Sequence, residues 1–406
     1  MRRRLLAGVV LVAAACLILA GCGGRTQLIR TQSVTVPGPT TTTSAVSPTP
    51  GMAIPLLATK NTTRVPGADP IADAAGVALA VFPSAAPGTH PHAVVLAPTD
   101  DWEAALAASV LMASPVRAPL LLSGATSLPA ATASALTTLA PTGAGALAGA
   151  QVIRVGDTPA PKGLRAATVR GIGPFALSAA IDRFASAAAG KPSTDVVVAS
   201  ADAPSYAMPA AGWAAESGDP ILFVSGAQIP TATRQALVAH QHPNIYVLGP
   251  TSVISDALVR ALGKYGKVQR VSGSDPSANS VAFASYRDPK CVSGQPCVHV
   301  PGSFGWALTS PGHGYVVINA QRTLDAAAAS ALSSSGSFGP QLLIQSPSSL
   351  PSSVLNYFLN YATPGYTQEG PTAAVYNHGW MIGDAGAVSV TVQAEVDSLL
   401  EAVPQR

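Results

Sequence analysis

A threefold internal repeat limits the folds open to this chain more than any other sequence feature. Short runs rich in β-branched residues recur along the chain, and each predicts a buried strand. These runs are residues 94–97, 196–199 and 316–319. An alanine-rich stretch typical of a helix follows each run. A recurring period of this kind indicates one supersecondary unit that is repeated along the chain.

Prolines and glycines keep the three copies in register. One proline opens a second strand in each copy, at Pro119, Pro220 and Pro340. Another begins a second helix, at Pro129, Pro230 and Pro351. A third strand ends in glycine, at Gly156, Gly249 and Gly383. Proline is tolerated at the first residue of a strand and in the first turn of a helix, so these columns predict where elements begin.

Strands rich in Val, Ile and Leu that alternate with helices predict parallel sheets covered by helices on both faces. The expected fold class is therefore α/β, with three tandem small open parallel-sheet (Rossmann-like) units. Their predicted bounds are residues 59–167, 168–269 and 270–406. The third copy is longer because it holds insertions around residues 291–297 and 365–370.

The N-terminus has the parts of an export signal. Arginines at positions 2–4 form a positive region, and the apolar stretch 5–20 is shorter than the ~20 residues that span a bilayer. It closes on Leu19-Ala20-Gly21-Cys22, which resembles the lipobox of bacterial lipoproteins. That resemblance implies a signal peptide over residues 1–21. It also implies a lipid on Cys22 that anchors the chain at the outer face of the cytoplasmic membrane. A plain signal peptide with an incidental cysteine is the alternative.

Residues 22–58 are predicted to be a disordered tether. Residues 40–44 read Thr-Thr-Thr-Thr-Ser, and prolines are scattered on both sides of them. Such a stretch cannot bury a hydrophobic core, and its prolines keep it extended. The tether would hold the folded body away from the lipid surface.

Charge and composition exclude two classes of protein. Removing the three signal arginines from 23 basic residues leaves 20, against 20 acidic residues. A nucleic-acid partner is not expected, because such proteins normally carry a basic excess. Hydrophobic residues make up 48% of the chain and charged residues 11%, which is typical of a globular body rather than a disordered chain.

Two cysteines remain beyond the predicted lipid site. Cys291 and Cys297 stand close together in the third copy, and outside the cytoplasm a disulfide is the expected state. The alternative is a metal site that includes His299, but a fourth ligand is not evident and structural zinc needs four. We therefore expect a disulfide, no metal and no cofactor.

A leading motif precedes each copy and carries a family resemblance. Arg64-x-x-Gly67-x-Asp69 and Arg270-x-x-Gly273-x-Asp275, together with the Pro119-Leu-Leu-Leu strand, resemble the second family of cell-wall-binding repeats of Gram-positive surface proteins. The resemblance covers about residues 64 to 403. It implies three tandem copies packed around a pseudo-threefold axis and non-covalent attachment to an anionic wall polymer. The family's second arginine is Pro70, Pro174 and Pro276 in this chain.

Basic residues gather where one copy ends and the next begins. They are Arg154, Lys162, Arg165 and Arg170 after the first copy, and Arg260, Lys264, Lys267 and Arg270 after the second. Equivalent segments of a repeat occupy equivalent places, so these side chains are the candidates for contacts with phosphate or carboxylate groups. A solvated face with ordinary salt bridges is the equal alternative.

Other motifs favour structural over chemical roles. Gly171-x-Gly173-x-x-Ala176 fits a dinucleotide fingerprint, but its counterparts carry an aspartate, so a turn is favoured. His90-x-His92 and His240-x-His242 lack nearby further ligands and are interpreted as loop histidines. Carboxylates at Asp100, Asp101 and Glu103 suit a helix N-terminus better than a ligand site.

The sequence therefore predicts a lipid-anchored envelope protein that binds wall or surface polymer without catalysis. A solute-binding lipoprotein with two α/β lobes is the alternative. Three copies, rather than two, argue against it. No G-x-S-x-G, H-E-x-x-H or Walker motif is present, so an enzyme is the weakest hypothesis.

Overall fold

The computed structural model describes residues 57–291, 297, 300, 302–336, 338–366 and 375–404, all within the compact unit Pro48–Arg406. The predicted signal peptide, Cys22 and nearly all of the predicted tether lie outside these residues. The tether was predicted to reach residue 58, but Leu57–Ala58 form strand β1, which pairs with the next strand. In the described part of the chain, no helix is long and apolar enough to cross a membrane.

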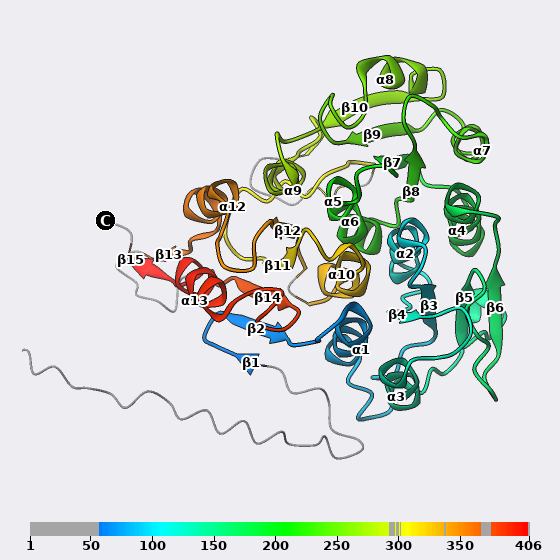
Figure 1. Cartoon of the computed structure of the whole chain (residues 1–406), viewed down its shortest axis with the longest axis horizontal. Coiled ribbons are helices and arrows are strands. Elements are labelled where there is room, and N and C mark those ends of the chain that lie inside the picture. Colours follow the sequence, from blue (N-terminus) through cyan, green and yellow to red (C-terminus); the bar gives the residue numbers. More distant parts are fainter. Residues whose placement is uncertain are drawn as a thin grey trace, which may run out of the picture. The chain divides into compact units, whose positions relative to one another are not determined.

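Three separate sheets contain the predicted strands (Figure 1). The first has the order β4 (Leu120–Ser123), β3 (Val94–Pro98), β5 (Val152–Val155), β6 (Ala166–Val169). The second has the order β8 (Ile221–Val224), β7 (Asp195–Ser200), β9 (Asn244–Leu248), β10 (Lys267–Val271). The third has the order β12 (Gln341–Ile344), β11 (Gly314–Asn319), β14 (His378–Ile382), β2 (Thr62–Val65), β1. All pairs in these sheets except β1–β2 are parallel, which confirms the predicted α/β class.

The fourth strand of each sheet comes from the leading motif of another copy. Strand β6 joins the first sheet and β10 joins the second. The third sheet takes β2 from the start of the body, with Arg64 opposite Met381, so the blue β2 lies beside the orange β14 in Figure 1. The sheets therefore do not follow the predicted copy boundaries at residues 59, 168 and 270. Each leading strand pairs with the strand that ends in glycine: β6 with β5, β10 with β9, and β2 with β14. The last of these pairs joins the start of the body to its end.

A helix follows each leading strand: α1 (Pro70–Val81), α4 (Pro174–Ala189) and α9 (Pro276–Ser285). Each begins with proline, whose missing N–H is not needed there. Asp69 and Asp275 cap two of them by accepting backbone N–H bonds. The motif glycines are required because a Cβ at Gly67, Gly171 or Gly273 would lie within 2.4 Å of the following helix. The fingerprint glycine is thus a packing element, as favoured from the sequence.

The alanine-rich helices lie between the sheets. Helices α2 (Trp102–Ala108), α6 (Pro209–Ser217) and α10 (Thr323–Ala328) contact one another pairwise (Figure 1). Their small side chains let the backbones approach closely, and one buried cluster joins residues of all three copies. Trp102 meets Phe223 edge to face across the first two copies, with ring centroids 5.5 Å apart. The copies therefore share one core, while the pseudo-threefold axis stays a prediction.

The remaining elements cover the outer faces and edges. Pro129, Pro230 and Pro351 are the N-cap residues of three of these helices. The helices are α3 (Ala130–Leu139), α7 (Thr231–Ala239) and α12 (Ser352–Tyr357). The other helices are η1 (Ser109–Met112), η2 (Gly145–Leu147), α5 (Pro204–Ala207), α8 (Asp256–Leu262), α11 (Ser330–Ser333), η4 (Phe358–Ala362) and α13 (Val390–Leu399). A short pair, β13 (Gly365–Tyr366) and β15 (Val403–Pro404), stands apart from the three sheets.

The first insertion in the third copy carries the disulfide. Cys291 and Cys297 are joined, with an S–S distance of 2.01 Å. His299, the alternative metal ligand, lies outside the described residues. Beyond the disulfide the chain returns to the core, where Phe304 and Trp306 pack against Trp213 of the second copy. The insertion is thus fixed to the second copy through aromatic contacts.

Candidate functional site

Two of the eight basic residues predicted to contact polymer donate hydrogen bonds to backbone carbonyls of the fold. Arg270 on β10 donates from Nη1 to the Gly249 carbonyl and from Nη2 to the Ile254 carbonyl, both at 2.7 Å. It also pairs with Asp256 at 3.0 Å. Arg270 therefore fastens the turn that follows β9. These bonds leave its guanidinium little capacity for a ligand.

Arg154 has the same kind of role in the first sheet. The β6 position that corresponds to Arg270 is Thr168, and Thr168 pairs with Arg154 of β5. The arginine has thus moved to the neighbouring strand, where Nε donates to the Thr158 carbonyl at 2.6 Å. Contact of Arg154 and Arg270 with polymer stays a prediction, and part of each guanidinium is already bonded within the fold. Charge and spacing alone did not distinguish them from the exposed cations.

The other predicted basic residues are exposed: Lys162, Arg165, Arg170, Arg260, Lys264 and Lys267. Four of them form two columns when the sheets are aligned on Thr168 and Arg270. Lys162 then corresponds to Lys264, and Arg165 corresponds to Lys267. Both columns stand where the outermost strand begins. Among the residues that the structure describes, none of the four forms a salt bridge with a carboxylate.

Arg170 and Arg260 lie elsewhere. Arg170 directly follows β6 and is therefore at the opposite end of that strand from Arg165. Arg260 is on α8. In the third sheet the corresponding edge is occupied, because β1 pairs with β2. The nearby Lys60 there is already paired with Glu401. The structure thus presents the basic columns on the first two sheets only.

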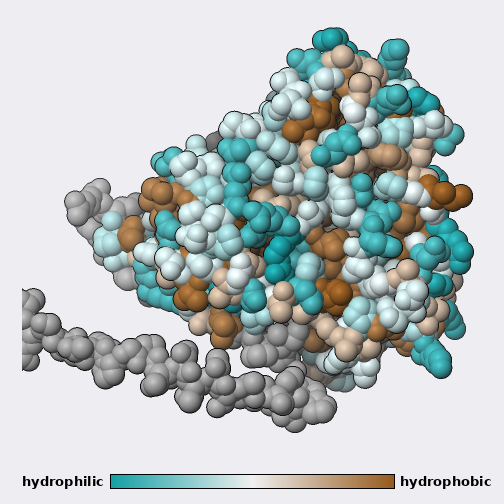
Figure 2. All heavy atoms as spheres, in the orientation of Figure 1, coloured by the Kyte–Doolittle hydropathy of each residue, from teal (hydrophilic) through white to brown (hydrophobic). Residues whose placement is uncertain are grey.

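Hollows surround the column residues of the second copy. Lys264 borders one of about 210 Å³ with Tyr265 and His242, and another of about 300 Å³ with Arg234. Lys267 borders a third, of about 360 Å³. On the face shown in Figure 2, hydrophilic residues gather at the top, where Figure 1 places α8 and β10. The start of β10 is therefore a basic edge with space on several sides.

Arg165, one of the two column residues of the first copy, is hydrogen-bonded to the backbone of the fold. Arg165 donates from Nη1 to the Ala148 carbonyl at 3.0 Å, which fixes one end of its guanidinium. Gly149 makes room for it, since a Cβ there would lie 2.7 Å from Nη1. The remaining N–H groups of this exposed guanidinium can still donate to an anion, because arginine carries five donors.

A hollow at the end of the first sheet contains the dinucleotide-like glycines. Gly171 and Gly173 line it together with Asp100 and Asp157. These carboxylates would repel a pyrophosphate, which argues against a nucleotide there. Asp101 is the N-cap of α2 and accepts from the Ala104 N–H at 2.8 Å, and burial raises the pKa of Asp101. The helix-cap interpretation of the acidic cluster is therefore confirmed for this residue.

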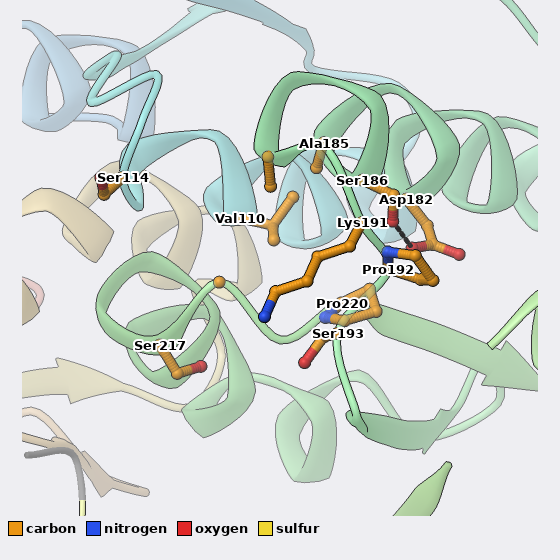
Figure 3. Close-up of a pocket in the computed structure, with 12 residues that line it drawn as sticks. Val110, Ser114, Asp182, Ala185, Ser186, Lys191, Pro192, Ser193, Ser217 and Pro220 are labelled. Atoms are coloured by element: carbon orange, nitrogen blue, oxygen red, sulfur yellow. Dashed lines mark hydrogen bonds between the residues drawn. The ribbon is translucent and has the colours of Figure 1, made fainter. Parts of the chain in front are cut away.

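The hollow in Figure 3 is bordered by Asp182, whose carboxylate pairs with the buried His240. The Lys191 side chain extends across this hollow, away from Asp182 (Figure 3). Nε2 of His240 lies 3.0 Å from both Asp182 oxygens, and Nδ1 lies 2.7 Å from the Ser193 carbonyl. Burial alone lowers the pKa of His240, but its bonds to Asp182 raise it overall. His240 stands in the turn after α7, as the loop interpretation predicted, but it is buried, and both of its ring nitrogens are bonded within the fold.

Residues 170–259 match the family model for Cell wall binding domain 2 (CWB2). The match confirms the family resemblance for the second copy, and the first and third copies lie outside the matched residues. The CWB2 repeat begins at Arg170 and reaches into α8, so it includes His240 and ends before Lys264.

Two solved structures from Clostridium difficile have a similar fold. Cwp8 is 16% identical with a TM-score of 0.61, over 84% of this chain and 52% of that chain. Cwp6 is 15% identical with a TM-score of 0.61, over 84% of this chain and 48% of that chain. This chain therefore spans about half the length of each, and at such identity the likeness shows the fold alone. No curated protein matches the chain.

Proposed function

We propose that this chain is a non-catalytic cell-envelope protein whose repeats bind an anionic wall polymer without covalent attachment. The observation that carries the proposal is the pair of exposed basic columns at the same structural position in two repeats. A CWB2 repeat forms one of the two copies. A repeating polymer offers the same charge at regular intervals, so equivalent cations on successive repeats can bind it together.

The expected binding is the sum of many weak contacts. One exposed ion pair contributes only about 0.2–1 kcal/mol, because water and salt screen it. Several pairs on one body act together, since each bound unit raises the effective concentration of the next. Added salt should release the polymer, because exposed charges lose their reach beyond about 8 Å at physiological ionic strength. Three sheets around one shared core also differ from the two-lobed solute-binding alternative.

Charge reversal tests the polymer site. The quadruple variant Lys162→Glu, Arg165→Glu, Lys264→Glu and Lys267→Glu should bind purified wall fragments more weakly by more than about tenfold. A co-sedimentation assay over a salt series measures this. Arg183→Glu with Lys191→Glu is the control, because both side chains are exposed on the second copy but away from β10. Unchanged, salt-insensitive sedimentation of the quadruple variant would contradict the proposed polymer site.

The lipid anchor is the other half of the proposed function. A cysteine that carries a diacylglycerol anchors stably, whereas a single chain binds only reversibly. Cys22→Ser should therefore abolish lipidation and leave unprocessed precursor or released protein. Metabolic labelling with a fatty acid checks this, and Cys16→Ser is the matched control because Cys16 lies within the predicted signal peptide. Label that persisted on the Cys22 variant would show that the lipobox assignment is wrong.

A further inference from the structure

We propose that the hollow beside β10 binds one anionic sugar unit, a hexose that carries a carboxylate or a phosphate. This inference rests on the proposed polymer function and names the unit that the second copy recognises. The hollow measures about 360 Å³, which is within the usual range of roughly 300–1,000 Å³ for small-molecule sites.

Two walls of different origin form the hollow. One wall is the face of β9 and β10 on which Asn244 pairs with Lys267 and Tyr246 with Gln269. The other wall is the start of the third-copy insertion, from Tyr286 to Lys290. The Cys291–Cys297 disulfide directly follows Lys290. The insertion therefore builds one side of the hollow.

Polar groups in the hollow suit a sugar ring. The Asn244 amide donates to Asp195 and the Gln269 amide donates to the Arg270 carbonyl, which leaves both amide oxygens as acceptors. The half-buried Tyr286 ring supplies an apolar surface for the C–H face of a pyranose. Hydroxyl groups that donate to amide oxygens and a ring that packs on an aromatic face describe a carbohydrate better than a fatty chain.

The charges in the hollow favour an anion. Asp288 accepts from the hydroxyls of Tyr246 and Tyr286 and from the Phe304 N–H, so its negative charge is shared among internal donors. Lys267 and Lys290 stand on opposite walls. Lys290 donates once, to the Gly302 carbonyl at 3.3 Å, and an ammonium has three donors. Neither lysine forms a salt bridge within the described residues, so both can donate to one carboxylate or phosphate.

The first sheet lacks the same chemistry and provides an internal comparison. The positions that correspond to Tyr246 and Gln269 are Ile153 and Ala167, both apolar. The predicted insertion also belongs to the third copy alone and packs on the second. Sugar recognition is therefore expected at one sheet only, while both sheets share the basic columns.

Ligand-observed NMR on the purified protein tests the inference with glucuronate, glucose 6-phosphate and glucose. The two anionic sugars should bind at least about tenfold more tightly than glucose, because only they meet Lys267 and Lys290. Lys290→Ala and Gln269→Ala should each weaken them severalfold without changing the melting temperature, since both side chains are exposed. Lys191→Ala is the matched control, because Lys191 is exposed on the second copy away from β10, and it should change nothing.

The outcomes separate this inference from the proposed function. Wall binding that responds to charge reversal while no probe binds would overturn the sugar site alone. Equal binding of glucose and glucuronate, or binding unaffected by Lys290→Ala, would also overturn it. Specific binding of the anionic sugars without salt-sensitive wall binding would support the hollow and reject the polymer function.

Discussion

Arg64→Ala should destabilise the protein by about 3–5 kcal/mol, because it removes a buried cation that holds the two ends of the body together. The Arg64 side chain is only 2% exposed. It donates to Gln393 at 2.9 Å and to the carbonyls of Gly383 and Asp384 at 2.8 and 2.9 Å. Without the guanidinium the buried Gln393 and Gly383 oxygens lose their donor, whereas the Asp384 carbonyl keeps the N–H groups of Ala387 and Val388. Urea unfolding monitored by tryptophan fluorescence measures the loss.

The loss should start in the third sheet. Strand β2 is bonded to β14 and lies more than 300 residues away from it in sequence. Hydrogen exchange should therefore accelerate first in β14 and α13. Arg270→Ala is the matched variant, since Arg270 makes equivalent bonds in the second sheet with a side chain that is 18% exposed. We expect Arg270→Ala to lower the free energy of unfolding by about half as much as Arg64→Ala. Thr168 occupies the same position naturally. Equal, global acceleration in both variants would contradict the proposed role of Arg64 in closure.

The stability of the protein should fall as the pH rises from 4 to 8, because several carboxyl groups are buried. Burial, helped by Asp325, raises the pKa of Asp73 to about 8. Burial also raises the pKa of Asp325 and of Asp219 to about 6 each. A group whose pKa is higher in the folded state stabilises the fold fully below its unfolded pKa, near 4, and loses that effect as the pH passes the folded pKa.

Two carboxylates around one guanidinium explain the high pKa of Asp73. Arg322 lies 2.6 Å from Asp73 and 2.5 Å from Asp325, and both carboxylates are fully buried. One positive charge balances only one of them. The third copy has Asn279 at the position of Asp73, and its amide oxygen accepts the Gly273 N–H just as Asp73 accepts the Gly67 N–H. A neutral amide therefore fits this place.

Asp73→Asn should leave the stability nearly unchanged below about pH 4 and raise it relative to the natural chain at pH 8.5, by roughly 2–4 kcal/mol. Arg322 and Asp325 then form a balanced pair. Guanidinium chloride unfolding at half-unit pH steps measures the curves. Asp256→Asn is the control, because Asp256 pairs with Arg270 at the surface. A constant difference between natural chain and variant across the range would mean that Asp73 is ionised throughout.

The basic residues show where sequence reasoning reaches its limit. Lys264 and Arg270 look alike in a sequence, because both are cations in one short basic segment. The structure exposes the first and bonds the second to the turn after β9. His240 is a similar case, since only folding brings Asp182 against it across 58 residues. Burial and partners depend on distant segments, so local charge patterns cannot determine them.

Runs of apolar residues and the proline and glycine columns act through local backbone preference and burial, so the strands, the helices, the repeat and the α/β class could be predicted from them. Three arrangements could not be predicted in this way: β2 completes the third sheet, Arg64 bonds to that sheet's other end, and an insertion of the third copy forms one side of a hollow on the second. Those arrangements join segments from different copies. The physical reason is that an open sheet edge and a buried charge are satisfied by whichever partner the folded chain brings near, regardless of its distance along the sequence.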